Sequence, residues 1–207
     1  MVDFFLSKIF FQNSKQYWEK RYASGGNSGE GSQGEKAKFK VDFINAFISE
    51  KDIESIIDFG CGDGVVAGRL NPKKYIGLDI SENAVKKCST QFRKDPKKSF
   101  YVYKPKEYGG DAIKTAQLGI SLEVIFHITE DDLFEKYMHD LFTSSQKYVI
   151  ILSNDTDKNP VYLGGHHRYR HFTKYVAEKL PEWKLVKKTD CPGLISNFHI
   201  YAKSNTQ

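Results

Sequence analysis

The feature that most constrains the fold of this chain is a run of glycines, Asp58-Phe-Gly60-Cys-Gly62-Asp-Gly64, directly after a short apolar segment. The apolar segment Ser55–Phe59 predicts a buried strand, and a helix is predicted at Val65–Leu70. Glycines at such a junction let the chain turn tightly and expose backbone N–H groups at a helix N-terminus. The run therefore predicts a strand-loop-helix unit that binds a small ligand.

The spacing of the glycines narrows the ligand class. It is G-x-G-x-G, with Val65 where the dinucleotide pattern G-x-G-x-x-G has its third glycine, which disfavours a dinucleotide pyrophosphate. The next predicted strand, Tyr75–Ile80, carries Asp79, 79 − 64 = 15 residues beyond the last glycine. A carboxylate at that place in a nucleotide-binding half-sheet reaches ribose hydroxyls. A purely structural glycine turn is the competing interpretation, and the position of Asp79 favours the ligand.

The rest of the chain alternates between strand and helix patterns. Further strands are predicted at Ser99–Tyr103, Ile120–Ile128, Lys147–Asn154, Trp183–Thr189 and Ser196–Lys203, and further helices around Phe39–Ile48 and at Asn83–Phe92, Asp131–Ser145 and Thr173–Leu180. This alternation predicts an α/β fold, a Rossmann-like doubly wound sheet of seven strands. The turn Asp190–Gly193 joins the last two strands as a hairpin, so the mostly parallel sheet must contain a C-terminal antiparallel strand.

A glycine-serine segment, Ser24–Gly34, divides the chain into two parts, 1–34 and 35–207. Its composition is typical of a flexible linker or loop. Before it, Met1–Phe11 predicts an amphipathic helix, because Asp3 and Lys8 interrupt the apolar residues and no small-residue cleavage site of a signal peptide follows.

Composition excludes several classes of protein. A hydrophobic fraction of 40% with a net charge of only +5 is too apolar for a disordered chain. No apolar run exceeds five residues (148–152), so we expect no membrane span. The cysteines Cys61, Cys88 and Cys191 are too few and too scattered for a disulfide framework, which favours a reducing compartment, and we expect the cytoplasm.

The positive charge is concentrated between Lys86 and Lys106, where eight basic residues and one acid give 8 − 1 = +7. Such a patch could attract a polyanion. A solvated helix end and loop is the simpler interpretation. The net charge of the whole chain therefore says little about its partner.

The segments Ile56–Gly64 and Tyr75–Ile80 resemble the first two motifs of the class I S-adenosylmethionine-dependent methyltransferases. The resemblance covers roughly residues 39–203 as a fold, with its specific motifs in 58–80. It implies S-adenosylmethionine as the cofactor, with Asp79 on the ribose, Ile80 beside the adenine, and the backbone near Ser121 and Leu122 at the amino group. The glycine loop supplies the remaining implied contacts, which are Asp58, Gly60, Cys61, Gly62 and Gly64, and Cys61 has no chemical role there.

A second resemblance joins two distant segments. Gly164–Thr173 (GGHHRYRHFT) resembles a histidine-and-arginine motif in a subset of small methyltransferases associated with surface-polysaccharide and other small-molecule pathways. That subset shares an N-terminal segment resembling residues 17–29. The resemblance implies that 1–34 is an N-terminal helix with a glycine-rich lid over a methyltransferase domain, 35–207. Trp18, Arg21 and Ser28 would then face the cofactor, and Tyr17, Tyr22 and His167 the acceptor.

Candidate catalytic residues lie at the expected ligand-binding edge of the sheet. Methyl transfer from a sulfonium is a displacement in which the enzyme orients the acceptor and, for a hydroxyl, removes a proton. His127, placed at the end of a predicted strand, or His166 is suited to take that proton. Arg168 and Arg170 would position an anionic part of the acceptor. A structural histidine and a solvated basic turn are the competing interpretations.

Two sets of residues could imitate a metal site. Glu123 with Asn154, Asp155 and Asp157 offers oxygen ligands, and His166, His167 and His171 offer nitrogens. Glu123 falls within a predicted strand, and Asn/Asp clusters are ordinary turn formers. Since neither set has a compelling spacing, we expect no metal.

The leading hypothesis is a methyltransferase that acts on a small acceptor, a hydroxyl of a sugar or related metabolite in surface polysaccharide biosynthesis. One alternative is a tRNA or other nucleic-acid methyltransferase that uses the 86–106 patch. It is disfavoured because Asn159-Pro-Val-Tyr162 follows the fifth strand, and not the fourth, and lacks the second proline of the amino-methylating motif. The other is a non-catalytic subunit that binds S-adenosylmethionine. The sequence leaves the oligomeric state open.

Overall fold

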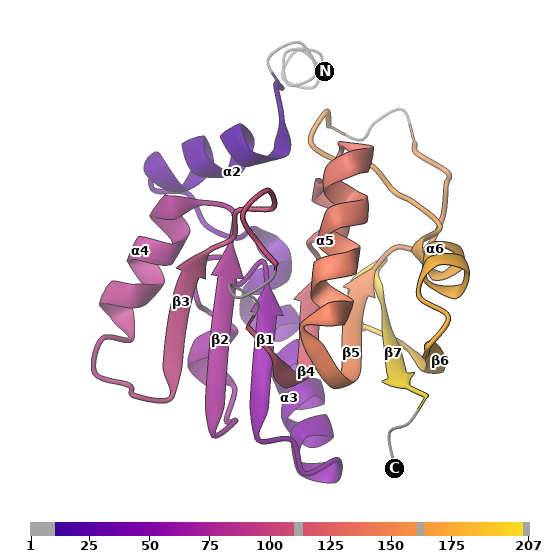
Figure 1. The fold of residues 1–207 in the computed structure, drawn as a ribbon. Coiled ribbons are helices and arrows are strands. Elements are labelled where there is room, and N and C mark those ends of the chain that lie inside the picture. The colour runs from indigo at the N-terminus through magenta and orange to yellow at the C-terminus, as the bar shows by residue number, and fades with distance from the viewer. Residues whose placement is uncertain (1–10, 110–113, 161–163, 205–207) are drawn as a thin grey trace.

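The protein is built on one seven-stranded sheet (Figure 1), and the structure, a computed structural model, describes residues 11–109, 114–160 and 164–204. The strand order is β3-β2-β1-β4-β5-β7-β6. The strands are β1 (Ser55–Phe59), β2 (Lys74–Asp79), β3 (Lys98–Val102), β4 (Ala116–Leu122), β5 (Ser145–Ser153), β6 (Trp183–Asp190) and β7 (Asn197–Lys203). β7 runs antiparallel to both of its neighbours, β5 and β6, and the other paired strands are parallel. The predicted mostly parallel sheet with a reversed C-terminal strand is confirmed.

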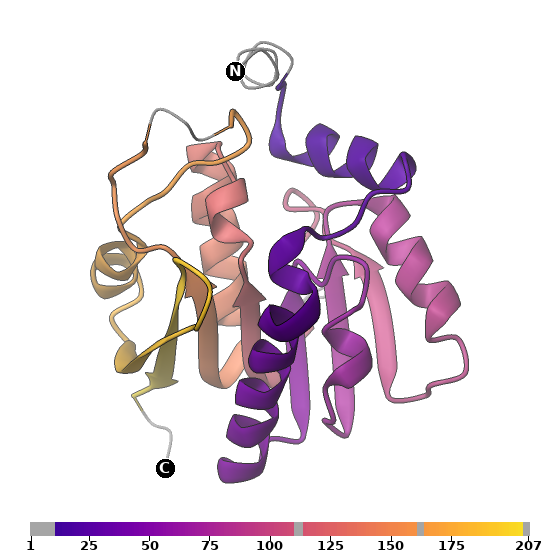
Figure 2. The same ribbon diagram turned by 180° about the vertical axis from the view of Figure 1, so that it is seen from behind.

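Helices cover both faces of the sheet (Figures 1 and 2). They are α2 (Ser14–Ala23), α3 (Gly34–Glu50), α4 (Glu82–Gln91), α5 (Asp131–Thr143) and α6 (Phe172–Lys179). Successive strand residues point to opposite faces, so Ile57 belongs to the core under α5 and α6, and Ile56 to the core under α3. Strands buried on both faces explain the continuous apolar runs in the sequence.

Two predicted elements differ from the structure. The strand predicted at Ile120–Ile128 ends at Leu122, because Glu123 adopts a left-handed backbone (φ 61°) and a short 3-10 turn, η4 (Ile125–His127), follows. The apolar residues after Glu123 do not extend the strand: Val124, Phe126 and Ile128 line a cavity, and Ile125 is buried in the core. The helix predicted at Val65–Leu70 is only a 3-10 turn, η2 (Ala67–Arg69), since Asn71-Pro72 and the start of β2 leave no length for more.

The N-terminal part forms a layer across one end of the sheet. α2, which the sequence patterns missed, lies above α4 (Figure 1), and the segment from Ser24 leads through a 3-10 turn, η1 (Glu30–Ser32), into α3. The helix predicted at Met1–Phe11 lies outside the described residues except for Phe11. The two parts of the chain thus meet at the carboxyl ends of the strands.

The carboxyl edge of the sheet has a crevice where strand order reverses. β1 is paired with β2 on one side and β4 on the other, so the connections after β1 and β4 leave in opposite directions. Open α/β sheets bind their ligands at such a switch point. The described part of the chain contains no helix that is both long and apolar enough to cross a membrane.

Candidate active site

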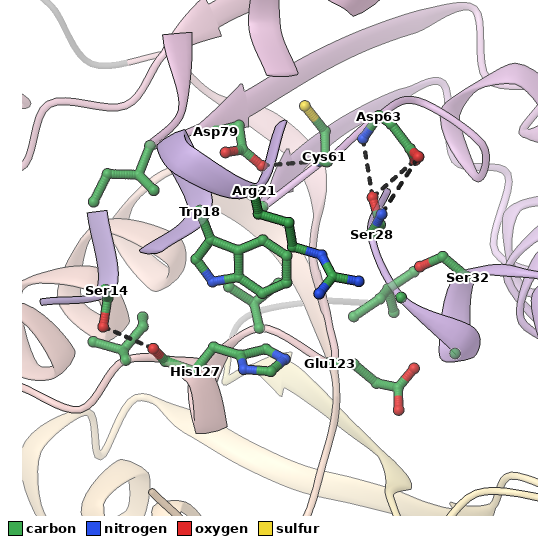
Figure 3. A pocket seen from close by; sticks show the side chains of 18 of the residues that line it. Ser14, Trp18, Arg21, Ser28, Ser32, Cys61, Asp63, Asp79, Glu123 and His127 are labelled. Carbon is green, nitrogen blue, oxygen red and sulfur yellow. Dashed lines mark hydrogen bonds between the residues drawn. The ribbon is translucent and has the colours of Figure 1, made fainter. Parts of the chain in front are cut away.

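A cavity of about 330 Å³ lies at this switch point (Figure 3). Its floor comes from the loop after β1 and the ends of β2 and β4, and its roof comes from α2 and residues 28–32. One end is closed by η4 and residues 166–167. Segments that are far apart in the sequence therefore converge on one partly covered cavity.

The glycine loop forms the floor through backbone that only glycine adopts easily. Gly60, Gly62 and Gly64 have φ values of 85°, 57° and 81°. A Cβ on Gly62 would lie 2.3 Å from the hydroxyl oxygen of Ser28, and a Cβ on Gly60 would lie 2.4 Å from a methyl group of Val124. The loop can approach the roof this closely only because side chains are absent. Gly60, Cys61 and Gly62 line the cavity, whereas Gly64 does not.

Asp79 ends β2 with its carboxylate against the glycine loop. One oxygen accepts the N–H of Gly62 and the other accepts the N–H of Ser81, both at 2.9 Å. Burial raises the pKa of Asp79 to about 6. The carboxylate lines the cavity with lone pairs to spare, beside Ile80 and Tyr103. A hydrogen-bond-accepting carboxylate at the end of the second strand is suited to bind the ribose hydroxyls of a nucleoside cofactor.

Asp58 is a second buried acid below the loop. It accepts a 2.6 Å hydrogen bond from the Tyr75 hydroxyl, and burial raises its pKa to about 7. Among the other residues expected near the cofactor, Leu122 lines the cavity. Ser121 does not: it is fully buried, and its hydroxyl lies 2.8 Å from that of Tyr137.

The roof is anchored at both ends of α2. At its start, the Ser14 hydroxyl lies 2.7 Å from the His127 carbonyl oxygen, and the Ser14 N–H donates to the Glu130 carboxylate at 2.9 Å. Beyond its end, the Ser28 hydroxyl donates to the Asp63 carboxylate at 2.8 Å. The glycine-serine segment predicted to be flexible therefore makes specific contacts with the floor.

Trp18 and Arg21 point from α2 into the cavity (Figure 3). The indole meets the His127 ring edge-on at 4.9 Å between centroids. The Arg21 Nε–H donates to the Asn27 carbonyl oxygen at 2.7 Å, which fixes the arginine stem. Tyr17 and Tyr22 also line the cavity, so the aromatic residues singled out from the sequence come together there.

Three histidines close one end of the cavity. His127 on η4 meets His166 and His167, with ring centroids 5.7 and 4.6 Å away. Burial lowers the pKa of all three imidazoles, that of His166 to about 4. The rings are therefore neutral near pH 7. His127 lies in the turn after β4, five residues beyond Leu122, and not at the strand end expected from the sequence.

Arg168 and Arg170 lie beside the cavity but do not line it. Both guanidinium groups pair with Asp131, and both donate to the Thr129 carbonyl oxygen. They border a second, open hollow with His171. The crevice shared with His127 therefore contains His166 and His167 from this segment but not the arginines.

The oxygen ligands considered from the sequence do not gather. Asp155 accepts from the Thr173 N–H and hydroxyl at the start of α6, and Asp157 accepts the His171 N–H. Glu123 instead pairs with Lys40, whose side chain is only 1% exposed. Sequence reasoning missed Lys40. The available signal was a lysine within the apolar stripe of α3, which contains Ala37, Val41 and Ile44.

Comparison with known proteins supports the fold. No protein-family model matches the chain, and no curated protein does. Among solved structures, the N-methyltransferase NodS from Bradyrhizobium japonicum, crystallised with S-adenosylhomocysteine, matches at a TM-score of 0.71 with 10% identity over 93% of this chain and 99% of that one. Magnesium protoporphyrin IX methyltransferase from Synechocystis, with bound S-adenosylmethionine, matches at 0.67 with 14% identity over 94% and 99%. The methyltransferase domain of a bacterial Hen1 matches at 0.63 with 13% identity over 81% and 98%.

The fold is therefore that of the class I S-adenosylmethionine-dependent methyltransferases.

Proposed function

We propose that this protein binds S-adenosylmethionine and transfers its methyl group to a hydroxyl of a small acceptor, a sugar or related metabolite of surface polysaccharide biosynthesis. The observation that carries the proposal is the enclosed cavity whose floor is the glycine loop and Asp79 and whose far end is the histidine cluster. The neighbouring structures include N- and O-methyltransferases, so the choice of a hydroxyl rests on the histidines of this chain.

Asp79 is the residue we assign to the ribose, and Ile80 and Tyr103 to the adenine side. The backbone of Gly60 and Gly62, together with Trp18, Arg21 and Ser28 from the roof, would enclose the rest of the cofactor. When bound, the cofactor supplies an electrophilic methyl group, whose bond to sulfur breaks as the bond to the acceptor oxygen forms, leaving the electron pair on sulfur. The roof covers part of the cavity and so limits the access of water to this step.

His127 and His166 are the groups that we assign to the acceptor hydroxyl. The Nδ1 atom of His127 lies 3.2 Å from the His166 carbonyl oxygen. Because a carbonyl oxygen can only accept a hydrogen bond, Nδ1 carries the hydrogen, and Nε2 keeps a lone pair. A hydroxyl donating to that lone pair is oriented for attack. The proton on the acceptor oxygen becomes strongly acidic as that oxygen gains the methyl group. A weakly basic imidazole is therefore enough to receive the proton.

Calorimetry with S-adenosylhomocysteine tests the cofactor site. Replacing Asp79 by Asn should weaken binding by about tenfold or more, because a charge-assisted hydrogen bond is lost. Glu82→Gln, on the exposed first turn of the neighbouring helix α4, should bind like the parent protein. Equal affinity in the Asp79 variant and its control would contradict the ribose assignment. A methyl-release screen over sugars and nucleotide sugars then tests the acceptor.

A nucleic-acid acceptor is less well supported. Small-RNA methyltransferases are among the structural neighbours. Yet the basic residues between 86 and 106 do not line the cavity, and Lys98 and Lys104 are paired with Asp95 and Glu107. Binding of tRNA that weakens steeply with salt would favour this second candidate. Binding of S-adenosylhomocysteine without any methyl acceptor would instead favour the non-catalytic subunit.

A further inference from the structure

Three histidine side chains converge in the cavity, and each brings one ring nitrogen close to those of the other two. One ring nitrogen from each of His127, His166 and His167 lies within 4.8 Å of the other two. The His166 and His167 ring centroids are 4.0 Å apart. A zinc-bound imidazole nitrogen lies about 2.0–2.1 Å from the metal, so binding of an ion would draw the three nitrogens closer together through small changes of side-chain torsion angle.

The hydrogen-bond partners of these rings leave lone pairs free. His127 donates through Nδ1 to the His166 carbonyl oxygen, so its Nε2 is available. His167 Nδ1 is buried and has no hydrogen-bond partner among the described residues. A buried nitrogen without a partner costs stability, which a bound cation would recover.

Aromatic side chains hold the imidazole planes in place. Tyr17 stacks on His166 at 4.2 Å and 12° between the planes, and Phe126 stacks on His167 at 5.7 Å and 19°. Ligand rings that are fixed by packing and by a hydrogen bond from the second nitrogen to a carbonyl are typical of metal sites. The cluster therefore has both the ligand atoms and the outer support of such a site.

We propose that His127, His166 and His167 bind one divalent transition-metal ion of the Zn²⁺ class and leave a coordination position open to the cavity. Three imidazoles with one open position are the donor set of catalytic zinc. The inference rests on the proposed function for the identity of the fourth ligand, the acceptor hydroxyl. Metal coordination would lower the pKa of that hydroxyl, and its proton would then leave to solvent water. With its Nε2 lone pair on the metal, His127 would act on the hydroxyl through the ion and would not be the direct base.

This inference replaces the expectation of no metal. The sequence offered His166, His167 and His171 as a set, but His171 turns away toward Asp155, 3.6 Å from Nε2 to the carboxylate. The third ligand is His127, 39 residues before His166 in the chain. Residues separated by 39 positions in the sequence form no recognisable metal-binding motif, and only the fold brings them together.

The test uses the full chain without a histidine tag, first stripped with a chelator and then titrated with Co²⁺. The expected result is about one Co²⁺ per chain, with the intense visible absorption of a four- or five-coordinate site. His127→Gln, His166→Gln and His167→Gln should each weaken Co²⁺ binding about 100-fold. His171→Gln, from the same segment, and His139→Gln, exposed on α5, are the matched controls and should bind as the parent does.

A second measurement on the unaltered chain does not depend on the folding of variants. Modification by diethyl pyrocarbonate, mapped by peptide mass, should be blocked by Zn²⁺ at 127, 166 and 167 and unchanged at 139 and 171. Co²⁺ binding that is equally weak in parent and variants, or protection spread over all histidines, would overturn the inference. If S-adenosylhomocysteine still binds in that case, the proposed function stands without the metal. If Co²⁺ binds as expected and S-adenosylhomocysteine does not, the proposed function fails alone.

Discussion

The hydroxyl of Ser28 donates a 2.8 Å hydrogen bond to the Asp63 carboxylate, and the Asp63 N–H donates back to the Ser28 oxygen at 3.1 Å. The two residues are 35 positions apart, one in the glycine-serine segment and the other in the glycine loop. This reciprocal pair joins the roof of the cavity to its floor.

Replacing Ser28 by Ala should open the roof. The two hydrogen bonds of the Ser28 hydroxyl to Asp63 disappear, together with its contact to the Tyr22 hydroxyl. Each is worth about 1 kcal/mol, so we expect S-adenosylhomocysteine to bind about tenfold more weakly and amides of 24–33 to exchange faster. Ser24→Ala, whose hydroxyl contacts only the Lys20 carbonyl oxygen at the end of α2, is the control. Calorimetry and hydrogen exchange measure the two effects. Unchanged exchange would show that the pair does not hold the roof.

Gly62→Ala and Gly25→Ala should separate backbone strain from steric conflict. Both glycines have positive φ, so alanine at either costs about 1–2 kcal/mol of stability. Only at Gly62 would the new methyl group also collide with the Ser28 oxygen, whereas nothing lies within 4 Å at Gly25. We expect the midpoint temperature of thermal unfolding to fall in both variants, and S-adenosylhomocysteine binding to be lost only in the Gly62 variant. Parallel loss in both would refute this distinction.

Asp58 should make the stability of the protein depend on pH. Burial raises its pKa from 3.8 to about 7. Between pH 3.8 and about 7 the native state therefore keeps a proton that the unfolded chain has already released. The stabilisation from this group is complete below pH 3.8 and is lost as pH rises through about 7. Asn resembles the protonated acid. Asp58→Asn should therefore reduce the fall in unfolding free energy between pH 5 and 8 by about 2 kcal/mol in urea titrations.

The control for that experiment is Asp42→Asn, an exposed acid on α3 that pairs with Lys38. Its variant should keep the slope of the parent protein. Asp79, whose pKa burial raises to about 6, contributes a smaller slope of the same sign that remains in both variants. A slope that Asp58→Asn does not change would contradict the burial argument.

Breaking the buried Lys40–Glu123 pair should be costly. Lys40→Met leaves the Glu123 carboxylate without its partner, and we expect the unfolding free energy to fall by about 3 kcal/mol. The double variant with Glu123→Gln should lose less than the two single losses added together. Lys38→Met, in the exposed pair with Asp42, should cost no more than about 0.5 kcal/mol. Additive losses in the cycle would show that the two groups are uncoupled.

Arg170 should matter for stability more than for the acceptor. Its guanidinium donates to the Ile128 carbonyl oxygen at 2.6 Å and to that of Thr129 at 2.9 Å. Arg170→Met removes the donor to the Ile128 carbonyl oxygen and leaves that of Thr129 with the Arg168 guanidinium, so we expect a loss of about 2 kcal/mol with unchanged binding of S-adenosylhomocysteine. Arg168→Met, at an exposed position, is the comparison. A raised KM for a methyl acceptor with unchanged stability would restore the substrate role expected from the sequence.

Local patterns were sufficient to predict the architecture because strands and helices here are set by burial. Ile56 and Ile57 face different cores, and the α5 stripe at Phe134, Met138 and Leu141 is buried, as its period requires. The prediction from local patterns was wrong after Glu123. This single left-handed residue ends the strand, although the apolar residues that follow it match a strand pattern. Backbone reversals of this kind are stabilised by tertiary contacts, which have no periodic signature.

The candidate site divides in the same way. The glycine loop and Asp79 share a strand-loop-strand unit, and their arrangement follows from local spacing. Lys40 and Glu123 are 83 residues apart, and the meeting of His127 with His166 depends on the turn after β4. The arginines were assigned to the crevice because their segment follows the fifth strand and resembles the histidine-and-arginine motif. In the structure both instead pair with Asp131 of α5.

The roof has a further consequence for how the protein is made. Ser14 bonds to Glu130, 116 residues later, so the first helix of the described chain emerges long before the surface that receives it. Contacts of such high separation form late, because the loop between them must close first. The nascent chain must therefore complete β4 and the start of α5 before it can enclose a ligand. Binding of the cofactor by a nascent chain would thus indicate that β1, β2 and β4 have already assembled.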